Sequence, residues 1–168
     1  MVKIPAMRTR KINIQVHEFD NLEKLPESCI NLLKKAREAA ENAYAPYSEF
    51  FVGAAVLLEN GEIITGNNQE NAAYPSGLCA ERVALFYASA NFPETAVKKI
   101  AITALSKDGR IVKQVTPCGA CRQVLLEVES KFKKSVEIIL DGEKILIFDG
   151  VENLLPFGFR PVSLKEEF

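Results

Sequence analysis

Three cysteines are spaced so that they could hold a metal ion beside an acid–base group. They occur in the strings Cys79-Ala80-Glu81 and Pro117-Cys118-Gly119-Ala120-Cys121. Cysteines three positions apart at a helix start share one helix face, and the positive end of the helix dipole stabilises thiolates. The pattern predicts that Cys79, Cys118 and Cys121 ligate one zinc ion per chain. Three protein ligands leave an open position for water, which is typical of catalytic rather than structural zinc.

Glu81 is the candidate proton shuttle. It lies two positions after Cys79, so the two side chains would not share a face inside a regular helix. We therefore expect Cys79 at the helix cap and Glu81 in the first turn, above the metal. Water on zinc can lose a proton near neutral pH, and Glu81 could take that proton and pass it to a substrate. Arg82 is predicted to donate to the thiolates and draw off their charge, although it could instead be a solvated helix charge.

The same cysteines allow a plainer interpretation, in which they form a structural zinc clip or are simply buried thiols. The position of Glu81 favours the catalytic alternative. Cys29 is expected to be a small apolar residue packed on the first helix. His17 is the single histidine and is expected to be exposed, which argues against a histidine-based triad or a multi-histidine metal site.

Alternating helical and extended patterns predict the elements that position these residues. A helix is expected to start near Leu25-Pro26-Glu27-Ser28 and to stop before Pro46. The further expected elements are strands at 51–58 and 62–65, a helix at 79–90, a strand at 99–105, a helix at 118–132, and strands at 136–140 and 145–148. This order predicts an α/β fold with a central mixed sheet and helices on its faces.

Composition and charge restrict the function classes. The chain has 168 residues and a net charge of −1, which argues against a broad basic surface for nucleic acid. No apolar run approaches the ~20 residues that span a bilayer, and the N-terminus lacks the apolar stretch of a signal peptide. We expect a cytoplasmic protein with no membrane partner. Residues 1–25 are an N-terminal extension of unknown role, either an arm or an added strand, and 26–168 form a single domain.

Several sequence blocks between about Ala43 and Phe159 resemble one family. They are Ala45-Pro46-Tyr47-Ser48-Glu49-Phe50, Val52-Gly53-Ala54-Ala55, Asn68-Gln69-Glu70-Asn71-Ala72-Ala73-Tyr74, Cys79-Ala80-Glu81-Arg82, Pro117-Cys118-Gly119-Ala120-Cys121-Arg122-Gln123, and Leu154-Leu155-Pro156 with Phe159. Together they resemble the small homotetrameric zinc-dependent cytidine deaminases. The resemblance implies a three-layer α/β/α sandwich whose central mixed sheet has about five strands.

The resemblance also implies substrate contacts. Asn68 and Glu70 would hold the ribose 3′-hydroxyl, since an amide donor beside a carboxylate acceptor suits a group that both gives and accepts hydrogen bonds. Phe50 would line the base pocket, Ala80 would contact the substrate, and Phe159 would approach the base bound to a neighbouring subunit of a homotetramer. Asn68 and Glu70 could instead be turn residues, and the two phenylalanines could be core residues.

The implied reaction is hydrolytic deamination of cytidine and 2′-deoxycytidine to uridine and 2′-deoxyuridine, with release of ammonia, in pyrimidine salvage. The partners would be the small nucleoside and water. Alternatives are a zinc deaminase acting on another aminopyrimidine nucleoside or on a base in a polynucleotide, and a non-catalytic zinc-stabilised interaction domain. The Asn68 and Glu70 pair favours a free 3′-hydroxyl, which the interior of a polynucleotide lacks.

Overall fold

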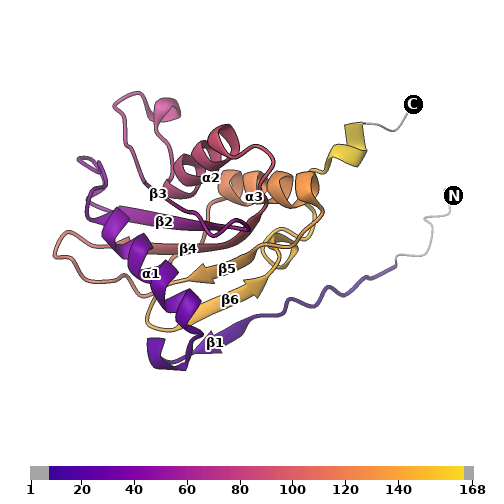
Figure 1. Cartoon of the computed structure of the whole chain (residues 1–168), viewed down its shortest axis with the longest axis horizontal. Coiled ribbons are helices and arrows are strands. Elements are labelled where there is room, and N and C mark those ends of the chain that lie inside the picture. Colours follow the sequence, from indigo (N-terminus) through magenta and orange to yellow (C-terminus); the bar gives the residue numbers. More distant parts are fainter. Residues whose placement is uncertain (1–7, 165–168) are drawn as a thin grey trace, which may run out of the picture.

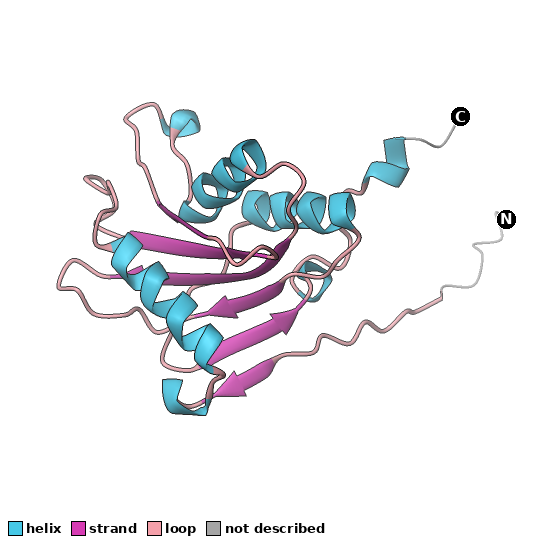
Figure 2. Ribbon diagram, in the orientation of Figure 1, coloured by secondary structure: helices cyan, strands magenta, loops and turns pink. Residues whose placement is uncertain are grey.

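The computed structural model describes residues 8–164, which form one mixed sheet with helices on both of its faces (Figures 1 and 2). The strands are β1 (His17–Phe19), β2 (Phe51–Leu58), β3 (Ile63–Asn67), β4 (Val97–Leu105), β5 (Glu137–Leu140) and β6 (Ile145–Asp149). The helices are α1 (Glu27–Ala40), α2 (Ala80–Asn91) and α3 (Gly119–Phe132), with four single-turn 3-10 helices at Leu22–Lys24, Tyr74–Ser76, Val151–Asn153 and Pro161–Leu164. Every helix and strand predicted above is present, with boundary shifts of a few residues.

The alternating side chains of β2 divide the core into two layers. Ala54 and Val56 are fully buried in the cluster that β2 forms with α2 and α3. Ala55, between them, is fully buried in the cluster formed with α1. Successive residues of a strand point to opposite faces, so one apolar strand supplies both layers. The result is the predicted three-layer α/β/α sandwich, with α1 alone on one face (Figure 1).

The sheet has six strands in the order β1-β6-β5-β4-β2-β3, which is the expected sheet of about five strands with one strand added at its edge. The additional strand is β1, which pairs antiparallel with β6 through His17 opposite Ile147. It comes from the N-terminal extension, whose residues 1–7 lie outside the described part. Of the two alternatives for the extension, an arm or an added strand, the structure therefore shows an added strand at His17–Phe19, although three residues are too few for alternation to indicate its bounds.

The direction of the central strands brings the two cysteine motifs together. β4 and β5 are parallel neighbours, and the connection between them contains α3. β3 is followed by α2, which contacts β2 and β3 on the same face. Cys79 and Cys118 are the N-cap residues of α2 and α3, with extended backbone at each. The two helix starts therefore present their cysteines to each other.

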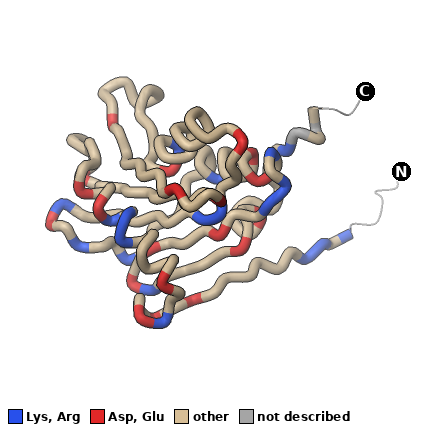
Figure 3. The backbone as a smooth tube through the Cα atoms, in the orientation of Figure 1, with Lys and Arg blue, Asp and Glu red and all other residues tan. Residues whose placement is uncertain are grey.

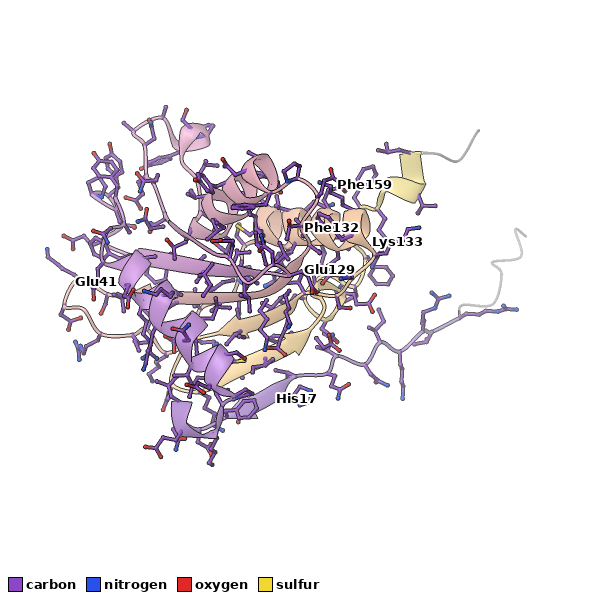
Figure 4. All side chains as sticks on the ribbon, in the orientation of Figure 1. His17, Glu41, Glu129, Phe132, Lys133 and Phe159 are labelled. Carbon is purple, nitrogen blue, oxygen red and sulfur yellow. The ribbon has the colours of Figure 1, made fainter. Side chains whose placement is uncertain are left out.

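The surface charges are mixed. Acidic and basic residues are interspersed along the described chain (Figure 3). Within residues 8–164 no helix is long and apolar enough to cross a membrane. His17 is exposed, as expected, and lies on the edge of the sheet away from α2 and α3 (Figure 4).

Candidate metal centre and active site

The sulfurs of Cys79, Cys118 and Cys121 converge where α2 and α3 begin. The Cys79 and Cys118 sulfurs are 3.8 Å apart, and the Cys118 and Cys121 sulfurs are 3.4 Å apart. All three lie within 4.8 Å of one another. Cys79 sits at the cap of α2, as predicted from its distance to Glu81. Within the described residues this is the one group of three such ligands, and Cys29 is buried on α1 as expected.

These separations fit zinc. A tetrahedral ion with Zn–S bonds of about 2.3 Å holds its sulfurs about 3.8 Å apart. A hydrogen bond from the Cys121 thiol, with further ones involving Arg82 and Cys118, lowers the pKa of Cys79 to about 5. The thiolate form of Cys79 is therefore favoured, and metals bind thiolates rather than thiols. The three cysteines are the residues that would hold zinc.

Arg82 lies against the sulfurs rather than in solvent. Its Nη2 atom is 3.7 Å from the sulfur of Cys79. Its Nε atom is buried and has no hydrogen-bond partner among the described residues. The contact argues against a purely solvated role for Arg82, and the drawing off of thiolate charge stays a prediction.

Glu81 is buried on the first turn of α2, with 4% of its surface exposed. Burial raises the pKa of the Glu81 carboxyl above its ordinary value of 4.5, and the neighbouring Cys79 adds to the effect. A carboxyl group shifted in this direction can hold a proton closer to neutral pH, as a general acid–base group requires. The geometry thus pairs a candidate metal centre with a candidate proton carrier.

A cavity of about 710 Å³ opens beside the cysteine cluster. Its walls include Cys79, Cys118, Glu81 and Arg82 from the two helix starts. The rest of the lining comes from three connecting segments and the start of β2 and is given by Tyr47, Ser48, Phe50, Val52, Asn68, Gln69, Glu70, Asn71, Tyr74, Gly77, Leu78, Val115 and Thr116. The volume suits a small ligand.

Asn68 and Glu70 line this cavity and brace the loop that precedes β2. The Asn68 side chain accepts from the backbone N–H of Val52 at 2.7 Å and donates to the Phe50 carbonyl at 3.0 Å. Glu70 accepts from the hydroxyl of Ser48 and from the backbone N–H groups of Tyr47 and Ser48. These hydrogen bonds, the Ser48 hydroxyl first, lower the pKa of Glu70.

Two other predicted substrate residues lie outside the cavity of their own chain. Ala80, the first residue of α2, is fully buried, and Phe159 is 59% exposed beyond β6 (Figure 4). The backbone of Phe159 is held by the side chain of Gln123, which donates to its carbonyl at 2.7 Å and accepts from its N–H at 3.2 Å. The predicted roles of both residues remain predictions.

Sequence reasoning missed two residues that the structure connects to the site. Ser48 supports Glu70, and Arg122 binds the carbonyl of Pro117, directly before Cys118. Both belong to sequence blocks quoted above. A hydroxyl that binds a carboxylate, or a guanidinium that binds a carbonyl, leaves no spacing pattern, however, and only the folded chain reveals such contacts.

Comparison with known proteins agrees with this geometry. A family model for the cytidine and deoxycytidylate deaminase zinc-binding region matches residues 26–136. The chain is similar to the cytidine deaminase of Halalkalibacterium halodurans, with 48% identity over 135 residues that cover 80% of this chain and 96% of that protein. It is 39% identical over 104 residues to a Mycobacterium tuberculosis cytidine deaminase, covering 61% of this chain and 74% of the relative.

The fold is likewise similar to solved structures. The crystal structure of cytidine deaminase from Burkholderia pseudomallei superposes with a TM-score of 0.66 at 35% identity, covering 80% of this chain and 100% of that one. The crystal structure of cytidine deaminase from Mycobacterium tuberculosis gives a TM-score of 0.57 at 34% identity, covering 77% and 94%. With its three-cysteine cluster and buried glutamate, the chain belongs to the cytidine and deoxycytidylate deaminase zinc-binding family and is a zinc-dependent hydrolytic deaminase.

Proposed function

We propose that this protein deaminates cytidine and 2′-deoxycytidine to uridine and 2′-deoxyuridine, releasing ammonia, as a step of pyrimidine salvage. The observation that carries the proposal is that one cavity joins the cysteine cluster, the buried carboxyl of Glu81 and the pair Asn68 and Glu70. Relatives at up to 48% identity bear the name cytidine deaminase.

Asn68 and Glu70 retain the hydrogen-bonding capacity that a hydroxyl needs. Asn68 donates one of its two amide hydrogens to Phe50, so the second is free for a ligand. Glu70 receives two hydrogen bonds on one carboxylate oxygen and one on the other, so an acceptor position is left. One free donor beside one free acceptor matches a sugar hydroxyl, and we assign the ribose 3′-hydroxyl to this pair. Phe50 would pack against the base.

Glu81 would move the protons. Bound zinc supplies an acidified water at the open coordination position. Glu81 would accept a proton from the attacking water and deliver it to the ring N3 of the pyrimidine. It would then take the proton of the hydroxyl now on C4 and pass it to the departing amino group. Water adds at C4, the C4–N bond breaks, and the products are the uridine and ammonia. The burial of Glu81 keeps competing solvent away from this transfer.

The cavity favours free nucleosides over nucleotides. Among the residues that line it, Arg82 is the one cation, and its guanidinium is directed at Cys79. A 5′-phosphate would therefore find no available positive partner in the described wall. A reducing compartment such as the cytoplasm also follows from the proposal, because all four cysteines are free and three must remain thiolates to hold zinc.

We further propose that four chains assemble and that Phe159 of one chain covers the base bound to another. The exposed apolar residues near the end of the described chain support this: Phe157 is 80% exposed and Phe159 is 59% exposed. Sedimentation at nanomolar concentration, combined with kinetics of Phe159→Ala, tests the proposal. The variant should raise KM and loosen the assembly together, and a fully active monomeric parent would contradict it.

The ultraviolet change on deamination tests the reaction directly. Purified zinc-loaded protein should turn over cytidine and 2′-deoxycytidine, and should turn over 3′-deoxycytidine, cytidine 5′-monophosphate, adenosine and a short single strand poorly. Turnover of the single strand or of a different aminopyrimidine nucleoside, with cytidine untouched, would assign the site to another substrate. If none of these compounds releases ammonia, the result would favour the alternative that the protein is a non-catalytic zinc-stabilised domain.

A further inference from the structure

One arginine joins the loop of a predicted metal ligand to the segment after β6. The Nε atom of Arg122 donates to the Pro117 carbonyl at 2.7 Å, and its Nη1 atom donates to the Leu154 carbonyl at 2.8 Å. The Pro117 carbonyl belongs to the peptide group that leads into Cys118. Pro117 has no N–H, so this carbonyl is the hydrogen-bonding group through which its backbone can be held.

The segment at the other end of this bridge is docked on α3 at further points. Gln123, the next residue, holds both backbone groups of Phe159. Gly158 packs against Leu126 so closely that a Cβ at position 158 would lie 2.2 Å from the leucine Cδ2 atom. These anchors follow Cys121 within the next turns of α3. Figure 2 shows the segment leaving the body beside this helix.

We propose that Arg122 is a positioning residue that couples the metal centre to the docking of residues 154–159. Its guanidinium fixes the orientation of the peptide group between Pro117 and Cys118. It thereby fixes the position of the Cys118 sulfur relative to the Cys121 sulfur. Because the same group also holds the Leu154 carbonyl, the docked segment supports the ligand loop. Coupling between two sites is reciprocal, so metal binding in turn stabilises the docked segment.

Arginine suits this task better than lysine. The two acceptors are carbonyls from distant parts of the chain, and the planar guanidinium presents donors to both at fixed angles. An ammonium is a point charge on a flexible stem and would not fix two carbonyl directions at once. Arg122→Lys should therefore fail to restore the coupling although it keeps the charge.

The experiment compares the parent, Arg122→Gln and Arg122→Lys, with Arg110→Gln as the control that removes an exposed positive charge. Zinc affinity is measured by chelator competition, and the visible spectrum of the Co²⁺-substituted protein reports the geometry at the sulfurs. Hydrogen exchange at 154–159 is measured with and without zinc.

We expect both Arg122 variants to bind zinc about tenfold more weakly, within the 5- to 150-fold common for coupled sites, and to have altered cobalt spectra. Zinc should slow exchange at 154–159 in the parent and the control but not in the Arg122 variants.

Parent-like affinity, cobalt spectrum and zinc-dependent exchange in Arg122→Gln would overturn the proposal. Should that variant fail to fold, Gly158→Ala provides a second route, because its Cβ would push the segment away from Leu126 while leaving Arg122 intact. It should speed exchange at 154–159 and weaken zinc binding together. Fast exchange with unchanged zinc affinity and cobalt spectrum would show that the segment does not support the ligand loop. None of these readouts depends on the substrate, so they stand apart from the proposed reaction.

Discussion

Gly66 of β3 lies directly beneath Ala80, the first residue of α2. A Cβ at position 66 would come within 2.7 Å of the Ala80 carbonyl oxygen and of the Ala84 backbone nitrogen. The absence of a side chain on β3 therefore sets how closely α2 packs on the sheet. Because Cys79 and Glu81 flank Ala80, this backbone contact also sets the position of the candidate metal ligand and of the candidate proton carrier.

Gly66→Ala should accordingly weaken zinc binding and lower kcat, with a loss of unfolding free energy of roughly 1–3 kcal/mol for overpacking. Gly53→Ala is the matched control, since its Cβ would lie 2.0 Å from the Ala36 carbonyl oxygen on the opposite face, against α1. The control should be destabilised but should keep the zinc affinity of the parent. Equal zinc affinity in the two variants would contradict the positioning role of Gly66.

Glu81→Gln should retain zinc but lose most turnover. The amide has a similar shape to the carboxyl but cannot accept a proton, and general acid–base catalysis contributes ~10²–10⁴-fold. Metal analysis and steady-state kinetics check both parts, with the exposed Glu127→Gln as the control for loss of one negative charge. A kcat within threefold of the parent would remove Glu81 from the proton-transfer role.

Arg82→Gln should lower kcat more than it weakens zinc binding. Without the guanidinium, three thiolates donate their full charge to the ion, which holds the metal but reduces its power to polarise a ligand. Groups that contact metal ligands in this way are worth roughly 10–100-fold in affinity or activity. Zinc affinity by chelator competition and kcat are measured on the same preparations, with Arg110→Gln as the control. An unchanged kcat in Arg82→Gln would contradict a role for Arg82 in tuning the metal.

Asp141, directly after β5, and Arg37 of α1 form a two-point ion pair in which the Arg37 side chain is 28% exposed. The distances are 2.7 and 2.8 Å, the Asp141 side chain is fully buried, and the Thr103 hydroxyl donates to it at 2.8 Å. Removing one partner leaves the other without its counter-charge, so Asp141→Asn or Arg37→Gln should cost roughly 3–5 kcal/mol of unfolding free energy. In a denaturation-based double-mutant cycle, the double variant should lose less than the two single losses combined. Strict additivity would show that the pair is not coupled.

Glu129 gives the protein a pH-dependent stability term. Burial raises the pKa of Glu129 above 4.5, and the nearby charge of Glu152 adds to this rise. The backbone N–H groups of Val136 and Val151, which donate to the carboxylate, and the charge of Arg160 act in the opposite direction but do not cancel it. The folded state therefore binds the proton more tightly than the unfolded chain, so this contribution to stability falls as pH rises from 4.5 through the raised pKa. Glu129→Gln keeps the acceptor oxygen and removes the titration. The stability difference between parent and variant should thus change across this pH window and level off above it, and a difference that is flat throughout would contradict the assignment.

Much of the fold was predictable because local patterns dominate it. The apolar run 51–58 appears as β2 with the expected ends, and the helix predicted from Cys118 appears as α3 with that cysteine at its cap. The cysteine spacing also predicted a cluster, since residues at two helix starts have few other ways to meet. These features depend on sequence separation and periodicity, which a single chain displays directly.

What could not be predicted depends on contacts between distant segments. The sequence allowed an added strand in the N-terminal extension, but β1 is too short to show alternation, so neither its bounds nor its pairing with β6 could be predicted. Ser48 donates to the Glu70 carboxylate, and Arg122 donates to two backbone carbonyls. These partners come together only when the chain folds. Gln123 holds the backbone of the exposed Phe159, and no spacing rule indicates that contact.

The pairing of β1 with β6 has a consequence for the order of folding. Its two strands come from nearly opposite ends of the described chain, and β1 has β6 as its one partner in the sheet. During synthesis His17–Phe19 is made early and must wait for Ile145–Asp149, while local pairs such as β2 with β3 can already form. In an unfolded chain, a three-residue ladder gains too little to offset the closure of so long a loop, so β1 waits until the rest of the sheet has folded. β1 should therefore be the last strand to join the sheet and the first to leave it, exposing the edge of β6 while the catalytic half of the molecule remains folded.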